Sequence, residues 1–325
     1  MSTIEMIESA ATRLAGHARR TPMLSSPFLD EIAGRGILVK PECQQHTGSF
    51  KFRGAWSALT ALGPKTRARG VLAYSSGNHA QGIALAAKRL GAPAVILMPK
   101  DAPKLKIDNT RALGADVRLF DRETDDRDAL GAALAQEHGL TLVKPFDEPF
   151  VIAGQGTTGL EIAAQASQLG VTLGDVLIPC GGGGLTSGIA LALNARAPRL
   201  RARPVEPDGF DDVRQSQLSG RIEKNERTSG NICDAILTPS PGSITFPIIK
   251  ELCGPGIAVS EDQALHAMAL AFTRLKLVLE PGGAVALAAA LFHPAKIEHG
   301  PVVVVASGGN VDAAVFRTAL DRFAE

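Results

Sequence analysis

An apolar strand that runs into a row of four glycines constrains the fold of this chain more than any other feature. Residues 175–179 read as a buried strand, residues 181–184 are all glycine, and residues 189–193 continue as an apolar helix. Glycine lets the backbone turn tightly and approach a ligand closely, and the N-terminus of a helix attracts anions. The segment therefore predicts a strand–turn–helix unit of an α/β protein that binds a phosphate group.

The glycine turn differs from the common nucleotide-binding loops. It is not followed by Gly-Lys-Ser or Gly-Lys-Thr, as a P-loop would be. Thr186 or Ser187, depending on the register chosen, occupies the place of the third glycine of the dinucleotide-binding motif. Glu206 ends the next predicted strand, where an acid could bind a ribose, so a nicotinamide-dependent enzyme remains an alternative.

A lysine lies at the predicted start of a helix, in the sequence Ser49-Phe50-Lys51. Burying an ammonium group is costly, so burial lowers the pKa of a lysine and leaves a nucleophilic amine. Such an amine can form a Schiff base with an aldehyde. Lys51 is therefore a candidate catalytic residue, which argues against the nicotinamide-dependent alternative. A surface lysine in the first turn of a helix is the simpler interpretation.

Polar residues also end two further predicted strands. Residues 75–79, Ser-Ser-Gly-Asn-His, join a short apolar strand to a helix and carry more polar side chains than helix capping needs. Ser307 follows an apolar strand and offers a neutral hydroxyl that can donate or accept a hydrogen bond. Ligands of open α/β sheets bind beyond the carboxyl ends of the strands, so both segments are candidate binding sites.

Strand-like runs alternate with helix-like runs, which predicts parallel sheets covered by helices. The strand-like runs are 37–40, 71–75, 94–98, 117–120, 142–145, 176–179, 202–206 and 301–306. Polar breaks at 64–70 and 145–149 predict a small substrate-side domain, residues 64–148, inserted into a large cofactor-binding domain, residues 1–63 and 149–325. We expect the ligand in the cleft between the two domains.

Charge and composition favour a cytoplasmic protein that needs neither nucleic acid nor a membrane. The formal net charge is +1, and the apolar runs have the length of strands rather than of membrane spans. No signal peptide is visible. The four cysteines show no Cys-x-x-Cys spacing, so they read as reduced thiols rather than zinc ligands.

Three motifs in this order, Ser-Phe-Lys-Phe-Arg-Gly-Ala, Ser-Ser-Gly-Asn-His and the glycine turn, resemble the fold type II family of pyridoxal-phosphate enzymes. The resemblance is to the branch of serine/threonine dehydratases and serine racemases, and it extends from Thr21 to Asn310. It implies an α/β fold like that of tryptophan synthase β, with two three-layer αβα domains and mainly parallel sheets. It also implies pyridoxal 5′-phosphate as cofactor, an amino-acid substrate and a homodimer.

The resemblance assigns roles to individual residues. Lys51 would carry the cofactor and act as general base, and Ser76 would be a second catalytic residue, which supplies a proton from the opposite face in the racemases. The other cofactor-binding residues would be Phe50, Asn78, Gly181, Gly182, Gly183, Gly184, Leu185 and Ser307. The substrate carboxylate would be held by Ser75, Ser76, Gly77 and His79.

The implied reaction is elimination of water from L-threonine or L-serine, which gives a 2-oxo acid and ammonia. Ser307, as a neutral partner of the ring nitrogen, would make the ring a weaker electron sink and favour rapid loss of the hydroxyl group. Phe146 matches the threonine dehydratases, since racemases carry a small polar residue there. Serine racemisation, dehydration of 3-hydroxyaspartate or 3-phenylserine, and a catalytically silent regulatory protein remain alternatives.

Two charged segments carry further expectations. Arg127 lies in an acidic run that reads as a solvated helix face, although it could bind a second substrate carboxylate. The turn after residue 206 is rich in carboxylates, whose oxygen atoms suit Mg²⁺ or Ca²⁺. The resemblance places a divalent cation on Glu206, the backbone carbonyl of Phe210, and Asp212. A solvated acidic turn is the alternative.

Overall fold

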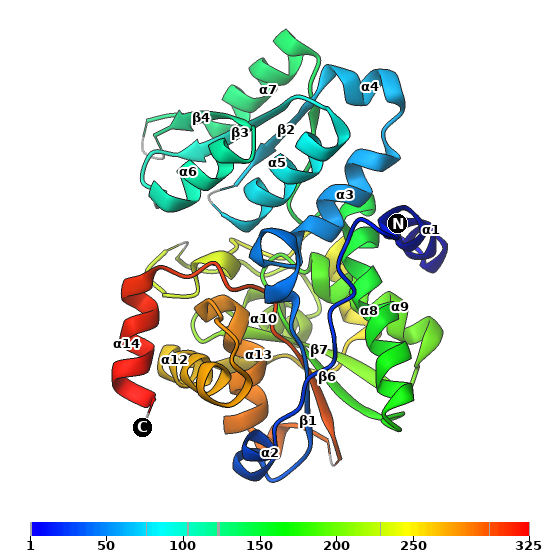
Figure 1. The fold of residues 1–325 in the computed structure, drawn as a ribbon, viewed down its shortest axis with the longest axis vertical. Helices are drawn as coiled ribbons and strands as arrows, with labels where there is room; N and C mark the ends of the chain where they lie inside the picture. Colours follow the sequence, from blue (N-terminus) through cyan, green and yellow to red (C-terminus); the bar gives the residue numbers. More distant parts are fainter. Residues whose placement is uncertain are drawn as a thin grey trace.

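Two parallel β-sheets organise the chain, one in each half of the computed structural model (Figure 1). The structure describes residues 2–75, 77–102, 104–121, 124–227, 229–298 and 300–324, with the backbone alone at 105, 127 and 128. Within these residues, one sheet has five strands in the order β1–β9–β6–β7–β8, and the other has four in the order β4–β3–β2–β5. The paired strands run parallel in both sheets.

The strands agree with the predicted runs except at two places. The strands are β1 (Ile37–Lys40), β2 (Val71–Tyr74), β3 (Ala94–Pro99), β4 (Asp116–Phe120), β5 (Thr141–Leu142), β6 (Gly174–Pro179), β7 (Leu200–Pro207), β8 (Ile257–Val259) and β9 (Val302–Val305). Strand β5 ends at Leu142, well before Pro145, which has no N–H for a sheet hydrogen bond. Strand β8 was not predicted, because three apolar residues at a sheet edge give too short a pattern.

Helices cover both faces of each sheet. The α-helices are α1 (Ile4–Leu14), α2 (Pro27–Ala33), α3 (Lys51–Ala61), α4 (Pro64–Arg69), α5 (Asn78–Leu90), α6 (Lys104–Ala112), α7 (Arg127–His138), α8 (Pro149–Gln168), α9 (Gly184–Arg196), α10 (Asp212–Ser219), α11 (Thr245–Leu252), α12 (Glu261–Leu270), α13 (Pro281–Phe292) and α14 (Ala313–Phe323). Short helical turns are η1 (Glu42–Gln44), η2 (His46–Gly48), η3 (Asp234–Ile236), η4 (Ala271–Leu275) and η5 (Pro294–Lys296). None of the helices described combines the length and the apolar character that a membrane span requires.

Strand β6 shows why these sheets need helices on both sides. Val176 and Ile178 pack into the core beneath α8 and α9, whereas Leu177 points into the core beneath α12 and α13 (Figure 1). Successive side chains of a strand face opposite sides, so an entirely apolar strand must be covered twice. The four-stranded sheet is covered in the same way, with α5 on one face and α7 on the other.

Sheet membership follows the predicted division of the chain without fixing its limits. The strands of the four-stranded sheet lie between residues 71 and 142, and those of the five-stranded sheet lie before or after this range. Limits at 63–64 and 148–149 remain our proposal. The second of them coincides with the start of α8.

Glycines let three helices cross with their backbones in contact. A Cβ atom on Gly156 of α8 would lie 2.8 Å from the backbone oxygen of Gly188 in α9. A Cβ atom on Gly154 would lie 2.4 Å from the backbone oxygen of Arg53 in α3. A side chain at either glycine would therefore push the helices apart. Helix α8 thus sets the distance between the start of α3, where Lys51 lies, and the start of α9.

A buried charge cluster, formed by Lys40, Glu42, Arg53 and Glu161, ties β1 and η1 to α3 and α8. Arg53 donates to both oxygens of Glu42 at 2.8 Å and to Glu161 at 2.7 and 3.0 Å. Lys40 donates to Glu161 at 2.6 Å and to the backbone oxygen of Thr21 at 2.7 Å. Two cations and two anions balance, so no charge in the cluster is buried without a partner.

We predict that Glu42→Gln lowers the free energy of unfolding by about 3 kcal/mol, because Arg53 would lose one of its two buried carboxylate partners. Glu8→Gln is the matched control, since Glu8 pairs with Arg196 at the surface and its loss should cost less than about 0.5 kcal/mol. Urea titrations of the cofactor-loaded protein measure both changes. Equal effects of the two substitutions would show that the cluster does not stabilise the fold.

Candidate active site

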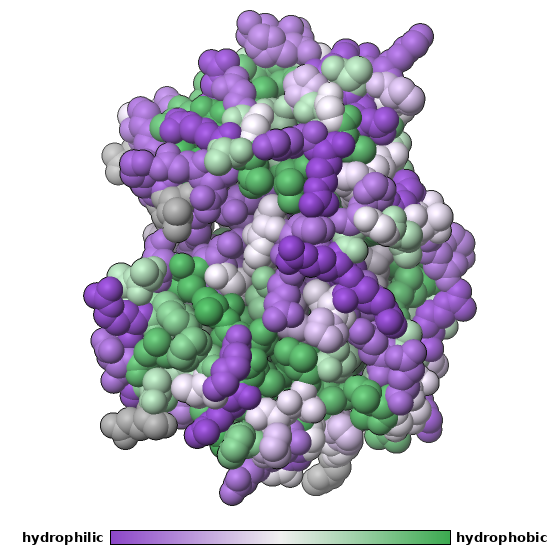
Figure 2. Space-filling view, in the orientation of Figure 1, coloured by the Kyte–Doolittle hydropathy of each residue, from purple (hydrophilic) through white to green (hydrophobic). Residues whose placement is uncertain are grey.

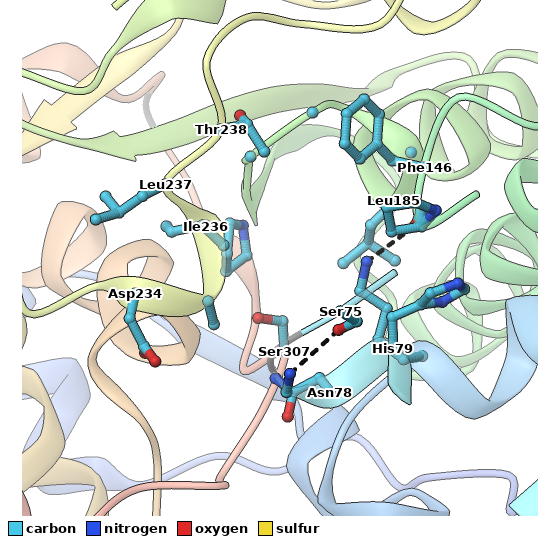
Figure 3. A pocket seen from close by; sticks show the side chains of 18 of the residues that line it. Ser75, Asn78, His79, Phe146, Leu185, Asp234, Ile236, Leu237, Thr238 and Ser307 are labelled. Atoms are coloured by element: carbon cyan, nitrogen blue, oxygen red, sulfur yellow. Dashed lines mark hydrogen bonds between the residues drawn. The ribbon is translucent and has the colours of Figure 1, made fainter. Parts of the chain in front are cut away.

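A cavity of about 230 Å³ lies between the two halves and is lined by residues of both. Twelve of the predicted site residues line it: Phe50, Lys51, Ser75, Gly77, Asn78, His79, Gly181, Gly182, Gly183, Gly184, Leu185 and Ser307. In Figure 3, Ser75, Asn78 and Ser307 lie close together, apart from Phe146 and Leu185. Ser76 and the side chain of Arg127 lie outside the part of the chain that the structure describes.

Lys51 is the first residue of α3 and points into the cavity. Its Nζ donates to the backbone oxygen of Pro145 at 2.9 Å and lies 5.1 Å from the centre of the Phe50 ring. Burial lowers the pKa of Lys51 to about 8, although the Glu280 carboxylate opposes the shift. A substantial fraction of the side chain is therefore an uncharged amine near neutral pH, as a nucleophile or general base requires.

The glycine loop, residues 181–184, joins β6 to the N-terminus of α9. Gly183 has a φ of 91°, a conformation that other residues rarely adopt. The Gly182 oxygen accepts from the Thr245 hydroxyl at 2.6 Å and from the Gly242 N–H at 3.2 Å. The loop is thus held through its carbonyl, while the first N–H groups of a helix have no partner within the helix. This arrangement fits a bound phosphate group.

Phe146 explains why the loop consists of glycine. A Cβ atom on Gly182 would lie 2.3 Å from the Phe146 ring, and one on Gly184 would lie 3.0 Å from Phe146 Cβ and 2.7 Å from Gln155 Oε1. The aromatic ring therefore fills the space that side chains of the loop would need. Gln155 is fully buried, and neither of its amide atoms has a hydrogen-bond partner among the residues described. The sequence analysis did not identify Gln155.

Glu280 is a second residue that the sequence analysis missed. Its Oε1 accepts from Asn78 Nδ2 at 2.6 Å, and Asn78 Oδ1 accepts from Asn310 Nδ2 at 2.7 Å. These two bonds fix the orientation of the Asn78 amide. Burial raises the pKa of Glu280 to about 7, while Lys106 and Asn78 act in the opposite direction. A lone acidic residue between Leu279 and Pro281 was the available signal.

His79 cannot act as a cation in this site. Its Nε2 lies 3.0 Å from the backbone oxygen of Val143, and a carbonyl oxygen only accepts, so Nε2 carries the hydrogen. Burial lowers the pKa of His79 to about 3, and Lys51 lowers it further. Any contact of His79 with a substrate carboxylate would therefore come from its backbone N–H at the start of α5, rather than from a charged ring.

An ion pair between the two halves closes one side of the cavity. Lys106 Nζ of α6 lies 2.8 Å from Asp234 Oδ2 of η3, and both residues line the cavity. The sequence offered no signal for this pair. Lys104 and Lys106 lie in the same helix, and only the fold distinguishes the exposed side chain of Lys104 from the buried one of Lys106.

The three predicted metal ligands lie outside the cavity, at the junction of β7 and α10. The Glu206 oxygens accept from the N–H groups of Val213 and Arg214 at 2.9 and 2.8 Å. Asp212 Oδ1 accepts from Asn225 at 2.6 Å, and Oδ2 is buried with no hydrogen-bond partner among the residues described. Burial raises the pKa of Glu206 well above its usual range and that of Asp212 to about 7.

This environment fits a cation. A positive ion would satisfy the Asp212 oxygen and reduce the unfavourable burial of two carboxylates, and the lone pairs that Glu206 has left could reach it. No cluster of three or more His, Cys, Asp or Glu side chains that could hold a metal occurs among the residues described. The expected set does not require one, because its third ligand is the backbone carbonyl of Phe210.

We predict that Gly182→Ala weakens cofactor binding at least about tenfold, because the new methyl group and the Phe146 ring cannot occupy the same space. Gly63→Ala is the matched control, since its φ is −59° and a Cβ atom there would meet nothing within 4 Å. Titration of the cofactor-free protein with pyridoxal 5′-phosphate, followed by absorbance, gives the affinities. Adding Phe146→Ala should restore part of the loss; unchanged affinity of Gly182→Ala would contradict the steric argument.

Comparison with known proteins agrees with this site. The family model described as "Pyridoxal-phosphate dependent enzyme" matches residues 14–308. The chain is 41% identical over 312 residues to an L-threo-3-hydroxyaspartate ammonia-lyase of a Pseudomonas species, with 96% of each protein covered. It is 39% identical over 313 residues to a serine racemase of Schizosaccharomyces pombe, with 96% of this chain and 95% of the relative covered.

Solved structures show the same likeness. A bacterial threonine deaminase, from T.th., superposes with a TM-score of 0.90 at 44% identity, covering 95% of this chain and 99% of the other. A serine racemase of Dictyostelium discoideum gives a TM-score of 0.89 at 38% identity, covering 96% and 99%. These findings confirm the resemblance and the fold class expected from the sequence. By its motifs, its fold and these relatives, the chain belongs to the family of pyridoxal-phosphate dependent enzymes.

Proposed function

We propose that this protein eliminates water from a 3-hydroxy amino acid, L-threonine or L-serine, and so forms a 2-oxo acid and ammonia. The observation that carries the proposal is the buried Lys51 amine, with a pKa near 8, in a cavity that also holds the uncharged Ser307. The names of relatives add support, since they include ammonia-lyases and a threonine deaminase.

The residues that would hold the cofactor surround Lys51. Pyridoxal 5′-phosphate, the cofactor of this family, supplies an aldehyde and an electron-withdrawing ring when it is bound. We assign its phosphate to the glycine loop and Leu185, its ring to Phe50, and its ring hydroxyl to Asn78, whose amide is oriented by Glu280. Ser307 would face the ring nitrogen with a hydroxyl, which does not force that nitrogen to stay protonated as a carboxylate would.

Lys51 would then move the proton. As an amine it can accept the Cα proton of the substrate, and the low pKa keeps much of it in the basic form near neutral pH. The substrate carboxylate would lie at the N-terminus of α5, against Ser75, Gly77 and the backbone of His79. Pro145 and Phe146 line the cavity next to Lys51 and keep water from the amine.

Racemisation of serine is the alternative within the same family, and it depends on Ser76 as a proton donor on the face opposite Lys51. Two ring faces need two separate proton carriers, one of which must be Ser76 if Lys51 serves the other. Phe146 favours elimination, because the racemases have a small polar residue at this position.

We also propose a cytoplasmic homodimer. The cysteines are all free, as is usual in a reducing compartment. Figure 2 shows an apolar surface over α2, α12 and α14, where Phe28, Ile32 and Phe272 expose 55%, 45% and 39% of their area. An apolar patch that monomers seldom leave in water suits a second copy of the chain.

We predict that the purified protein is yellow, and that it converts L-threonine to 2-oxobutyrate and L-serine to pyruvate. Lys51→Ala should lower turnover at least about a thousandfold, because both the covalent attachment of the cofactor and the general base are lost. Release of ammonia and oxo acid measures turnover, and circular dichroism checks that the variant is folded.

Chiral analysis separates the alternatives. Ser76→Ala should weaken racemisation much more than elimination from the L-amino acid, since Lys51 already serves that face. Formation of D-serine from L-serine faster than pyruvate would establish the racemase instead. A colourless protein that gains no imine absorbance with pyridoxal 5′-phosphate would contradict the function as a whole.

We further propose that Glu206, Asp212 and the Phe210 carbonyl bind Mg²⁺ or Ca²⁺ as a stabilising ion with no part in bond breaking. Chelation should lower the melting temperature, and either ion should restore it, because a ligand of the native state stabilises by mass action. Glu206→Gln combined with Asp212→Asn should remove the response to added metal. If chelation changes neither melting temperature nor activity, these carboxylates are only a buried polar turn.

A further inference from the structure

We propose that Lys106 binds a second carboxylate on the substrate, so that the preferred substrates are 3-hydroxy amino acids with a carboxylate in place of the methyl group of threonine. This inference rests on the proposed elimination reaction, and it names a specificity-determining residue that the sequence analysis did not find. In chemical terms, the preferred substrate is a 3-hydroxy dicarboxylic amino acid such as 3-hydroxyaspartate.

Lys106 reaches the place where the substrate would lie. It projects from α6 into the cavity, and its side chain is only 10% exposed. Its Nζ lies 3.8 Å from the point that a Cβ atom on Gly77 would occupy, and its Cδ lies 3.6 Å from that point. The ammonium group therefore lies over the turn before α5, where the first carboxylate of the substrate is expected. A second carboxylate two bonds further along the substrate would meet it.

The present partner of Lys106 can be exchanged for a ligand. Asp234 Oδ2 lies 2.8 Å from Lys106 Nζ, but the side chain of Asp234 is 53% exposed. A carboxylate in contact with water gains little from an ion pair, whereas a buried ammonium group needs an anion beside it. A substrate carboxylate could therefore displace Asp234 toward solvent while Lys106 stays paired.

Lys106 stays charged for this task. Burial favours its neutral form, but the carboxylates of Asp234, Glu280 and Asp312, which face it from η3, the start of α13 and the start of α14, outweigh burial and raise its pKa. Lys51 is the other ammonium group among the described residues that line the cavity, and the cofactor engages it. His79 is neutral. Recognition of a second carboxylate by charge therefore falls to Lys106 in the part of the cavity that the structure describes.

Two substrates that differ by a single group provide the test. L-threonine and L-threo-3-hydroxyaspartate differ only by a methyl group in place of a carboxylate, so the ratio of their kcat/KM values isolates recognition of that carboxylate. Lys106→Met should lower the ratio, hydroxyaspartate over threonine, by about tenfold to a hundredfold, as loss of a charge-assisted hydrogen bond does. Lys106→Arg, which keeps the charge, should retain most of the ratio.

Lys104→Met is the matched control. It removes the same charge from the same helix, but Lys104 is 88% exposed and pairs with Asp108 away from the cavity, so the ratio should stay at the wild-type value. A Lys106→Met variant that loses activity equally on both substrates would overturn the proposal, because Lys106 would then bind the first carboxylate or maintain the fold. An unchanged ratio would overturn it as well.

A binding measurement separates this proposal from the proposed reaction. Calorimetry with the cofactor-loaded protein should show that succinate binds at least about tenfold more tightly than butyrate, which has the same carbon chain and one carboxylate fewer. Lys106→Met should abolish the difference, and equal binding of the two acids by the wild type would contradict the role of Lys106. If the wild type turns over neither amino acid, elimination is refuted, while the succinate result still decides the role of Lys106.

Discussion

The ion pairs of Arg53 set the position of the reactive lysine. Arg53 lies two residues after Lys51 in the first turn of α3, and its guanidinium group is held by Glu42 on one side and Glu161 on the other. Apolar contacts alone would allow a helix to shift or rotate at low cost, whereas a bidentate arginine requires one geometry. The direction in which Lys51 enters the cavity follows from this constraint.

The cavity owes its chemistry to the carboxyl ends of parallel strands from two sheets. The glycine loop follows β6, Ser307 follows β9, and the turn with Ser75 follows β2. Each strand is buried, so polar side chains are placed only where the strand ends. The site is consequently polar at its centre and surrounded by apolar cores, which explains the lowered pKa of Lys51 and the raised pKa of Glu280.

What the sequence could predict depended on whether the signal was local. The glycine loop and the sequence around Lys51 are contiguous, so the residue types alone indicated a turn and a reactive amine. Glu280 and Lys106 gain their significance from partners 202 and 128 residues away, which only the packing of the two sheets brings near. Strand β8 was missed for a related reason, because its three residues form a strand only through pairing with β7.

The glycine crossings of α8 with α3 and α9 act as a ruler for the enzyme. With backbone touching backbone, no side chain can be exchanged for a longer or shorter one to alter the spacing between the lysine and the phosphate site. Evolution of new substrate preferences must therefore leave this distance alone and act on the opposite wall, where α6 and η3 supply side chains that do not set it. Diversity of activity within one family, from racemases to ammonia-lyases, is compatible with a frame of this kind.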